Sequence, residues 1–264
     1  MRHLYLSAII GICFFVVGNT NFGSSKNFQT KFVEDNDLWM EDDINSKAGI
    51  TKEMFNAVIA AGLEIYKPMA TENDEKLIIN ANWSNSTVNA DCSRNYGRVT
   101  VNMYGGLARR SEVTPEGFAL VLCHELGHAY GGTPYLYDYD KGQDAMSAEG
   151  QSDYYGSKEC LRKILPKLEM PVVTATSYTE RRCKELGAPE SAEYKLCIRQ
   201  LDGSMSLGYL LSVLKEEPKP SFETPDTNEV EETEVSYPAT IQCRTDTYHN
   251  GSLNLNRPRC WFKD

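Results

Sequence analysis

Two of the chain's four histidines lie four residues apart, with a glutamate next to the first, in the stretch CHELGHAYGG at 123–132. On a helix, His124 and His128 share one face, so both imidazoles can point at a single ion, and Glu125 lies beside that face. Two imidazoles that hold zinc, with a carboxylate that takes a proton from zinc-bound water, suit hydrolysis at a carbonyl. The alternative is a histidine pair that only makes hydrogen bonds inside a buried helix.

A catalytic zinc site usually has three protein ligands and one open position, so the third ligand decides the type of site. One large class of zinc peptidases continues the motif with a third histidine, but this chain has Pro134 at that position. The stronger candidate is Glu149 on the next predicted helix. Asp153, four residues later, can accept a hydrogen bond from a ligand histidine. Asp153 itself and the distant His249 are the alternative third ligands.

At these residues the sequence resembles the gluzincins, the thermolysin-like and related zinc metallopeptidases, which pair H-E-x-x-H with a downstream E-x-x-[SA]-D. The resemblance covers about residues 98–165 and implies Zn²⁺ as the cofactor. It also implies that a strand beside the active-site helix binds extended peptide, a role that RVTVNMY at 98–104 can fill. The roles that it implies are a catalytic base (Glu125), three metal ligands (His124, His128 and Glu149) and an orienting carboxylate (Asp153).

Gluzincins generally add a tyrosine or histidine that donates a hydrogen bond to the oxyanion formed in the transition state. His249 and Tyr248 are the first choices for this role, against the plain alternative that both only pack in a C-terminal loop. The other candidates are Tyr154, Tyr155, Tyr178 and Tyr194.

The histidine pair requires a helix, and the sequence around it carries start and stop signals. Thr114 can cap the helix, Pro115 suits its first position, and Gly131 and Gly132 end it. The other predicted helices run from Thr51 to just before Pro68 and over 147–165, 177–187, 190–201 and 204–216.

Two strands are predicted, at 77–83 and 98–104, and the second alternates apolar with polar residues. The sequence therefore predicts a mainly helical α+β fold, with a zincin-like domain whose small antiparallel or mixed sheet lies beside the HExxH helix. The expected divisions are a signal peptide (1–22), a loosely ordered polar N-terminal arm (23–50), the zincin-like catalytic domain (51–216), an acidic, proline-rich linker or loop (217–239) and a disulfide-stapled C-terminal segment (240–264).

The first residues indicate export. Arg2 and His3 precede an apolar run from Leu4 to Val17, which is typical of a bacterial signal peptide and too short to span a bilayer comfortably. We therefore expect a periplasmic or secreted protein with no stable membrane anchor after signal cleavage.

Export would place the cysteines in a compartment that permits disulfides. The two short pairs are Cys183 with Cys197 and Cys243 with Cys260. Cys160 lies three helical turns after Glu149 and can meet Cys123 on the catalytic helix. In that arrangement Cys92 is left over, either as a plain free thiol or as a thiolate that caps the zinc.

The formal net charge of −10, with no basic stripe, argues against nucleic acid as a partner. The function expected is zinc-dependent hydrolysis of peptide bonds in proteins or peptides outside the cytoplasm, with Glu125 as general base. The alternatives are a zinc amidase that acts on peptide cross-links of the cell wall and a non-catalytic zinc-binding module. The sequence indicates no oligomeric state.

Overall fold

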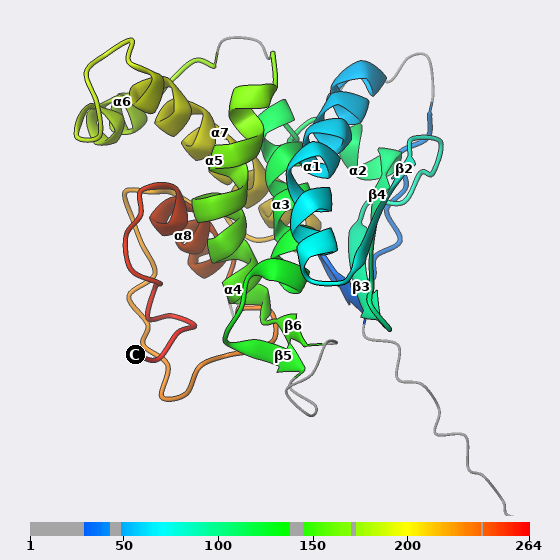
Figure 1. Ribbon diagram of the computed structural model, residues 1–264. Helices are drawn as coiled ribbons and strands as arrows, with labels where there is room; N and C mark the ends of the chain where they lie inside the picture. The colour runs from blue at the N-terminus through cyan, green and yellow to red at the C-terminus, as the bar shows by residue number, and fades with distance from the viewer. Residues whose placement is uncertain (1–28, 43–48, 138–144, 170–172, 239) are drawn as a thin grey trace, which may run out of the picture.

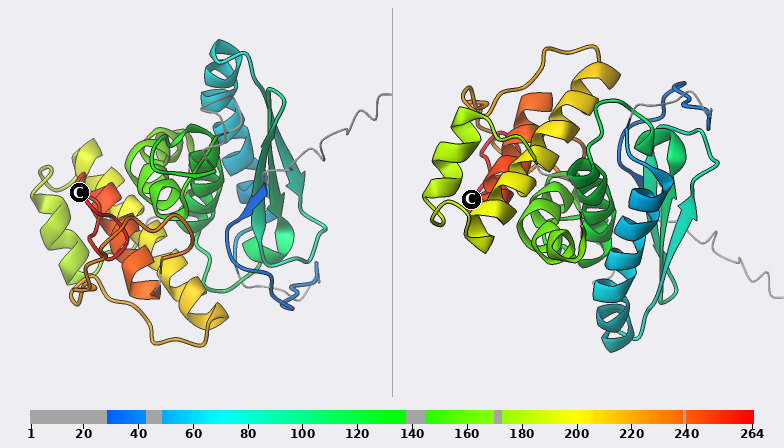
Figure 2. Two further views of the ribbon diagram at one scale, coloured as in Figure 1. Left: turned by 90° about the horizontal axis from the view of Figure 1, so that it is seen from below. Right: turned by 90° about the horizontal axis from the view of Figure 1, so that it is seen from above.

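The computed structural model describes residues 29–42, 49–137, 145–169, 173–238 and 240–264. The predicted signal peptide lies outside these residues. The fold is α+β and mainly helical, as the sequence predicts, with a small sheet on one side of a stack of helices (Figure 1, Figure 2).

The main sheet is mixed and has the strand order β1-β3-β4-β2. Strands β2 and β4 are parallel, whereas β3 runs antiparallel to both β4 and β1. The bounds are Gln29–Lys31 (β1), Lys76–Asn82 (β2), Ala90–Asn95 (β3) and Arg98–Tyr104 (β4). Strands β2 and β4 were predicted to within a residue, but β3 was missed because ADCSRN is mostly polar.

The N-terminal arm contributes to the folded body, which the sequence analysis did not anticipate. In β1, Thr30 lies opposite Cys92 of β3, and the following Phe32 and Val33 are buried. The expectation of a loosely ordered arm is therefore wrong for residues 29–33. A strand of three residues has too few positions to display alternation, and its pairing partner lies far along the chain.

Helix α3 (Pro115–Tyr130) is the central element of the fold. It packs against α1 and the sheet on one side and against α4 and α7 on the other (Figure 2). It is buried all round from Glu116 to Ala129, as a core helix must be. Thr114 Oγ1 accepts a hydrogen bond from the Gly117 N–H at 3.1 Å, so the predicted cap is present.

The remaining helices surround α3. A continuous helical run from Glu149 to Lys167 matches the predicted helix at 147–165 and contains a π-helical turn at Gly156–Cys160. The other bounds are α1 (Lys52–Glu72), α2 (Gly105–Ala108), α4 (Glu149–Tyr155), α5 (Leu161–Ile164), a 3₁₀ turn (Leu165–Lys167), α6 (Ser177–Lys184), α7 (Ala192–Leu214) and α8 (Ile241–Ser252). Two short strands, β5 (Tyr135–Tyr137) and β6 (Met146–Ser147), join α3 to α4.

Three predictions about helices are wrong. Pro68 lies inside α1, where burial of Tyr66 and Ala70 outweighs the hydrogen bond that proline cannot make. The helices predicted at 190–201 and 204–216 are one helix, α7, and Gly203 marks a close contact instead of a break. A Cβ at Gly203 would lie 2.8 Å from the Glu116 carbonyl oxygen. The C-terminal segment, predicted as a loop, begins with α8.

The acidic segment after α7 has no helix or strand among its described residues and crosses the surface of the body. The Val230 N–H donates to the Arg259 carbonyl at 2.9 Å, and the Glu149 N–H donates to the Val235 carbonyl at 3.2 Å. Its far end thus lies against the start of α4, which brings Tyr237 close to the predicted metal ligands.

All three disulfide pairs suggested by the sequence are confirmed. Cys123–Cys160 ties the centre of α3 to the end of the π-helical turn, while Cys183–Cys197 joins α6 to α7. Cys243–Cys260 closes the C-terminal segment over 17 residues. Cys92 is the free cysteine among the described residues, and it is buried.

Candidate metal centre

Two consecutive helices supply the candidate metal ligands. His124 and His128 lie one turn apart on α3, and Glu149 is the first residue of α4. The two helices touch at Gly127, where a Cβ would lie 2.8 Å from the Ser152 carbonyl oxygen. Only glycine permits this approach, so Gly127, which directly precedes His128 in HELGH, is needed for the two helices to pack together.

The Nδ1 atoms of both histidines are held by oxygen acceptors. His124 Nδ1 lies 2.6 Å from Asp153 Oδ1, and His128 Nδ1 lies 2.9 Å from the Ser147 carbonyl oxygen. Each Nδ1 therefore carries the ring proton, which leaves a lone pair on each Nε2. The two Nε2 atoms face each other at 3.1 Å. Two acceptors at this distance need a proton or a metal ion between them.

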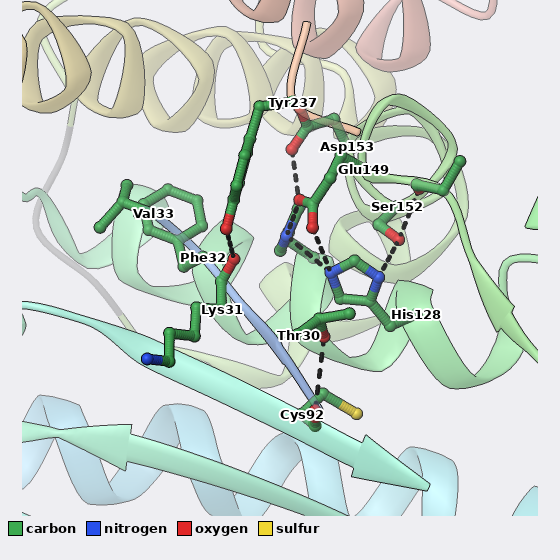
Figure 3. A network of polar contacts seen from close by, with 12 residues as sticks. Thr30, Lys31, Phe32, Val33, Cys92, His128, Glu149, Ser152, Asp153 and Tyr237 are labelled. Atoms are coloured by element: carbon green, nitrogen blue, oxygen red, sulfur yellow. Dashed lines mark hydrogen bonds and ion pairs between the residues drawn. The ribbon is translucent and has the colours of Figure 1, made fainter. Parts of the chain in front are cut away.

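Glu149 completes the group. Its Oε2 lies 3.4 Å from His124 Nε2 and its Oε1 lies 3.7 Å from His128 Nε2 (Figure 3). Among the described residues, Oε2 has no hydrogen-bond partner. The ligand atoms of the three residues all lie within 4.8 Å of one another, and all three side chains are buried. A buried set of two imidazoles and a carboxylate with spare lone pairs suits a divalent metal ion, and it is the donor set of many catalytic zinc sites.

Asp153 orients His124 and is itself held by Arg244 of α8, a residue that the sequence analysis did not single out. Arg244 Nε lies 2.8 Å from Asp153 Oδ2, and Nη2 lies 2.9 Å from Oδ1. Both side chains are buried. Burial alone would raise the pKa of Asp153, but Arg244 and His124 outweigh burial and hold this pKa well below its usual range. The sequence offered no signal for this ion pair because the partners are 91 residues apart.

The two histidines have opposite pKa shifts. For His124, burial disfavours the charged ring, but the neighbouring Asp153 and Glu149 outweigh burial and raise the pKa to about 10. For His128, burial dominates and lowers the pKa to about 4. Without a metal ion at neutral pH, the pair therefore holds one proton more than two neutral imidazoles, and this extra proton is on His124.

Glu125 lies in the same core but makes no comparable contact. Both of its carboxylate oxygens are buried and have no hydrogen-bond partner among the described residues. Burial raises the pKa of Glu125 well above its usual range, and Glu149 adds to this. Glu125 is not part of the ligand group. It is an additional carboxyl beside the ligand His124.

Tyr237, which the sequence analysis missed, is the tyrosine that faces the ligand group (Figure 3). Its hydroxyl donates to the Lys31 carbonyl at 2.6 Å. Its pKa is raised, first by burial and then by the negative charge of Glu149. The acidic, proline-rich composition around Tyr237 suggested a solvated loop, and nothing in that composition indicated contact with Glu149.

The other candidate donors to the oxyanion do not face the ligand group. Tyr248 is buried beside Asp153 and Arg244, behind the ligand group. His249 packs on Phe222 and makes a 3.0 Å contact with the Tyr178 hydroxyl, so it is neither a ligand nor next to one. The hydroxyls of Tyr154 and Tyr155 bond to Leu255 and Tyr66, and Tyr194 packs in the small cluster around Cys183 and Cys197.

The structure corrects the expected peptide-binding strand and favours the plain free thiol of the two alternatives for Cys92. The strand at 98–104, β4, lies between β3 and β2, so its backbone is already paired on both sides and cannot bind extended peptide. On that side of the sheet β4 is followed by β3, and β1 pairs with the outer edge of β3. Cys92 of β3 lies outside the ligand group, and burial raises the pKa of its thiol well above the usual range, which disfavours a thiolate ligand.

A second cluster of metal-binding residue types consists of Asp226, Cys243 and Cys260. The two cysteines form a disulfide, so their sulfur atoms are not available as thiolate ligands. This cluster is therefore not a metal site.

Searches of protein-family models, of curated proteins and of solved structures found no match to this chain. None of the described helices is long and apolar enough to cross a bilayer. Three disulfides are typical of proteins from oxidising compartments outside the cytoplasm. The function must therefore be argued from the site itself.

Proposed function

We propose that this chain is an exported zinc metallopeptidase of gluzincin type, which hydrolyses peptide bonds in proteins or peptides. The observation that carries this proposal is the convergence of three buried ligands, with another buried carboxyl, Glu125, beside them that has no hydrogen-bond partner among the described residues. His124, His128 and Glu149 would hold the ion, and Asp153 would orient His124 as in carboxylate–histidine–zinc sites.

Zn²⁺ bound at such a site lowers the pKa of a bound water and polarises the carbonyl of the scissile bond. The chain supplies the proton transfer. Glu125 lies at the site without a competing hydrogen bond, so its carboxylate is free to take a proton from the attacking water and to pass it to the leaving amine. Burial raises the pKa of Glu125, which brings its proton affinity closer to those of the attacking water and the leaving amine.

Tyr237 replaces His249 and Tyr248 as the proposed donor to the oxyanion. Its hydroxyl already donates to a backbone carbonyl at 2.6 Å, that of Lys31, and lies close to Glu149. A neutral phenol with a raised pKa can donate a hydrogen bond to a carbonyl oxygen on which negative charge develops.

A purely structural zinc site is the weaker alternative. Structural sites are usually closed by four cysteine or histidine ligands and have no use for a spare buried carboxyl, whose desolvation costs free energy. Glu125 is such a carboxyl, and a catalytic role accounts for it. No feature of the described residues favours an amidase of cell-wall cross-links over a peptidase.

The substitution Glu125→Gln tests the proposal. We expect the variant to bind one zinc ion with nearly unchanged affinity, because Glu125 is not a ligand, and to lose peptidase activity by about 10²–10⁴-fold. Zinc content by atomic emission and hydrolysis of a casein or quenched peptide substrate provide the measurements. The matched control is Glu159→Gln, an exposed glutamate on the π-helical turn, which should keep full activity. Unchanged activity in Glu125→Gln would refute the proposed mechanism.

A further inference from the structure

In the part of the chain that the structure describes, the candidate metal centre is closed to a substrate. His124, Glu125 and His128 have no exposed surface, and Glu149 is 3% exposed. A peptidase must admit a polypeptide to these residues, so part of the structure that covers them has to move. The cover includes β1 and the residue that follows it, Phe32, together with Tyr237 (Figure 3).

Strand β1 occupies a position that an extended peptide can take. It is paired antiparallel with β3, which would be the free edge of the sheet without it. The pairing continues past the strand, since the Phe32 N–H donates to the Ala90 carbonyl at 3.0 Å. An extended peptide that adds to a sheet edge forms the same kind of backbone hydrogen bonds.

Two side chains of the site also hold the backbone of this segment. Tyr237 donates to the Lys31 carbonyl at 2.6 Å, and Arg244 Nη1 donates to the Phe32 carbonyl at 3.1 Å. Arg244 is the residue that also pairs with Asp153. These bonds use only carbonyl groups of the segment, so any extended peptide in the same place can make them.

The side chain of Phe32 fills a closed apolar position beside a ligand. Its ring is fully buried and packs edge-on against the His124 ring, with 5.3 Å between the centroids. The Arg244 guanidinium lies 5.1 Å from the Phe32 ring centroid. When Phe32 leaves, the position that it vacates can accept a bulky apolar side chain.

We infer that residues 29–33 act as an intramolecular inhibitor. They occupy the position on the β3 edge where an extended peptide substrate would bind. The substrate would place a bulky apolar side chain where Phe32 now lies. The inference rests on the proposed peptidase function. The chain in this form has low activity, and its activity rises when residues 29–33 withdraw from β3. Tyr237 then loses the Lys31 carbonyl and can donate to the substrate.

Cleavage in the loop after Val33 tests this inference. Residues 34, 35, 37 and 38 are exposed, so a recognition site for a sequence-specific protease can replace 34–38 without disturbing buried residues. The zinc-loaded protein is immobilised by its C-terminus, cut and washed, and then assayed with a quenched peptide that contains phenylalanine. We expect at least a tenfold rise in hydrolysis over the same protein left uncut. Protein without the recognition site, treated with the same protease, is the control.

A synthetic peptide of residues 29–38 provides a readout that does not depend on activity. We expect the labelled peptide to bind the washed protein, as measured by fluorescence anisotropy, and to slow the removal of zinc by a chelator. The same peptide with Phe32→Ala should bind at least tenfold more weakly, whereas Leu38→Ala, at an exposed position, should bind equally well.

The intact chain gives a second test in case the cut protein loses its fold, which circular dichroism will reveal. Phe32→Ala in the uncut chain should raise hydrolysis several-fold, and Leu38→Ala should not. Equal activity of the cut and uncut forms, or equal binding of the two peptides, would overturn the inhibitor and leave the proposed function standing. A folded, zinc-loaded, cut protein that hydrolyses no peptide would contradict the proposed function as well.

Discussion

At the scale of single residues, the hydrogen bonds behind the ligands determine what the site can bind. Asp153 and the Ser147 carbonyl fix the ring protons of the two histidines on Nδ1, and this leaves both Nε2 lone pairs pointing into one small space. The unpartnered Oε2 of Glu149 adds a third acceptor. A space lined by acceptors attracts either a proton or a cation, and the two compete.

This competition predicts a release of protons when zinc binds. Because the pKa of His124 is raised to about 10, the metal-free site carries a proton on His124 at pH 7, and zinc must displace it. The apparent zinc affinity should therefore rise about tenfold per pH unit between pH 6 and 8. Titration calorimetry in buffers of different ionisation enthalpy measures the release directly.

The Glu125→Gln variant tests whether the released proton comes from His124 or from Glu125. We expect it still to release about one proton per zinc, because that proton comes from His124. A binding enthalpy that is independent of the buffer, in both proteins, would show that the metal-free site holds no proton.

Arg244 is the residue whose loss should damage the site most without touching a ligand. Arg244→Met leaves Asp153 as a buried carboxylate without its cation, so we expect a loss of stability of about 3–5 kcal/mol. Because Asp153 also orients His124, zinc affinity should fall about 10–100-fold. Denaturant unfolding and zinc competition with a chromophoric chelator measure the two effects.

The control for Arg244 is Arg199→Met, which removes the partner of a different buried carboxylate, that of Glu116, two turns before the histidines on α3. It should cost stability without lowering zinc affinity. If both variants bind zinc equally well, Arg244 only supports the fold.

At the scale of elements, the site is a contact between α3 and α4, and two features hold that contact. Gly127 allows the helices to approach, and the Cys123–Cys160 disulfide fastens the turn before His124 to the end of the π-helical turn. Either helix alone carries an incomplete ligand set, so the relative position of the two decides metal affinity.

Removal of this disulfide should therefore weaken zinc binding. In the double variant Cys123→Ala/Cys160→Ala, we expect a loss of stability of about 4 kcal/mol, since the bond closes a loop of 37 residues. We also expect a several-fold loss of zinc affinity. The matched control is Cys183→Ala/Cys197→Ala, which removes a disulfide between α6 and α7. It should lower stability by about 3 kcal/mol and leave zinc affinity unchanged. If both double variants change zinc affinity equally, the Cys123–Cys160 disulfide has no specific role in positioning the ligands.

The elements that carry the ligands were predictable because their signals are local. The Thr114 cap, the continuous apolar run of α3 and the four-residue spacings of both motifs all operate within one or two turns. The ligand group followed from these signals. Arg244 and Tyr237 were not predictable, since each reaches the site through contacts between segments that are distant in the chain. For the same reason β1 was missed, because the strand with which it pairs, β3, is about 60 residues away in the chain.

At the scale of the whole molecule, the site borders a large apolar core to which none of the metal ligands belongs. One continuous apolar cluster joins the sheet, α1, α3, α5 and α7, with Phe55, Leu122 and Leu161 among its fully buried members. Three disulfides add constraint at the periphery and beneath the ligands. The ligand group occupies one end of this core, where α3 meets α4.

We therefore expect the metal-free protein to stay folded, unlike zinc modules whose folding requires the ion. Free zinc at about a hundredfold above its dissociation constant should stabilise the protein by about 2.7 kcal/mol, which corresponds to a rise of roughly 5–10 °C in Tm. Excess chelator should reverse this rise while the far-UV circular dichroism and the cooperative thermal transition persist. A chelated protein that loses its helical signal at 25 °C would instead identify the ion as a structural component, and the His124→Ala variant should then fail to fold as well.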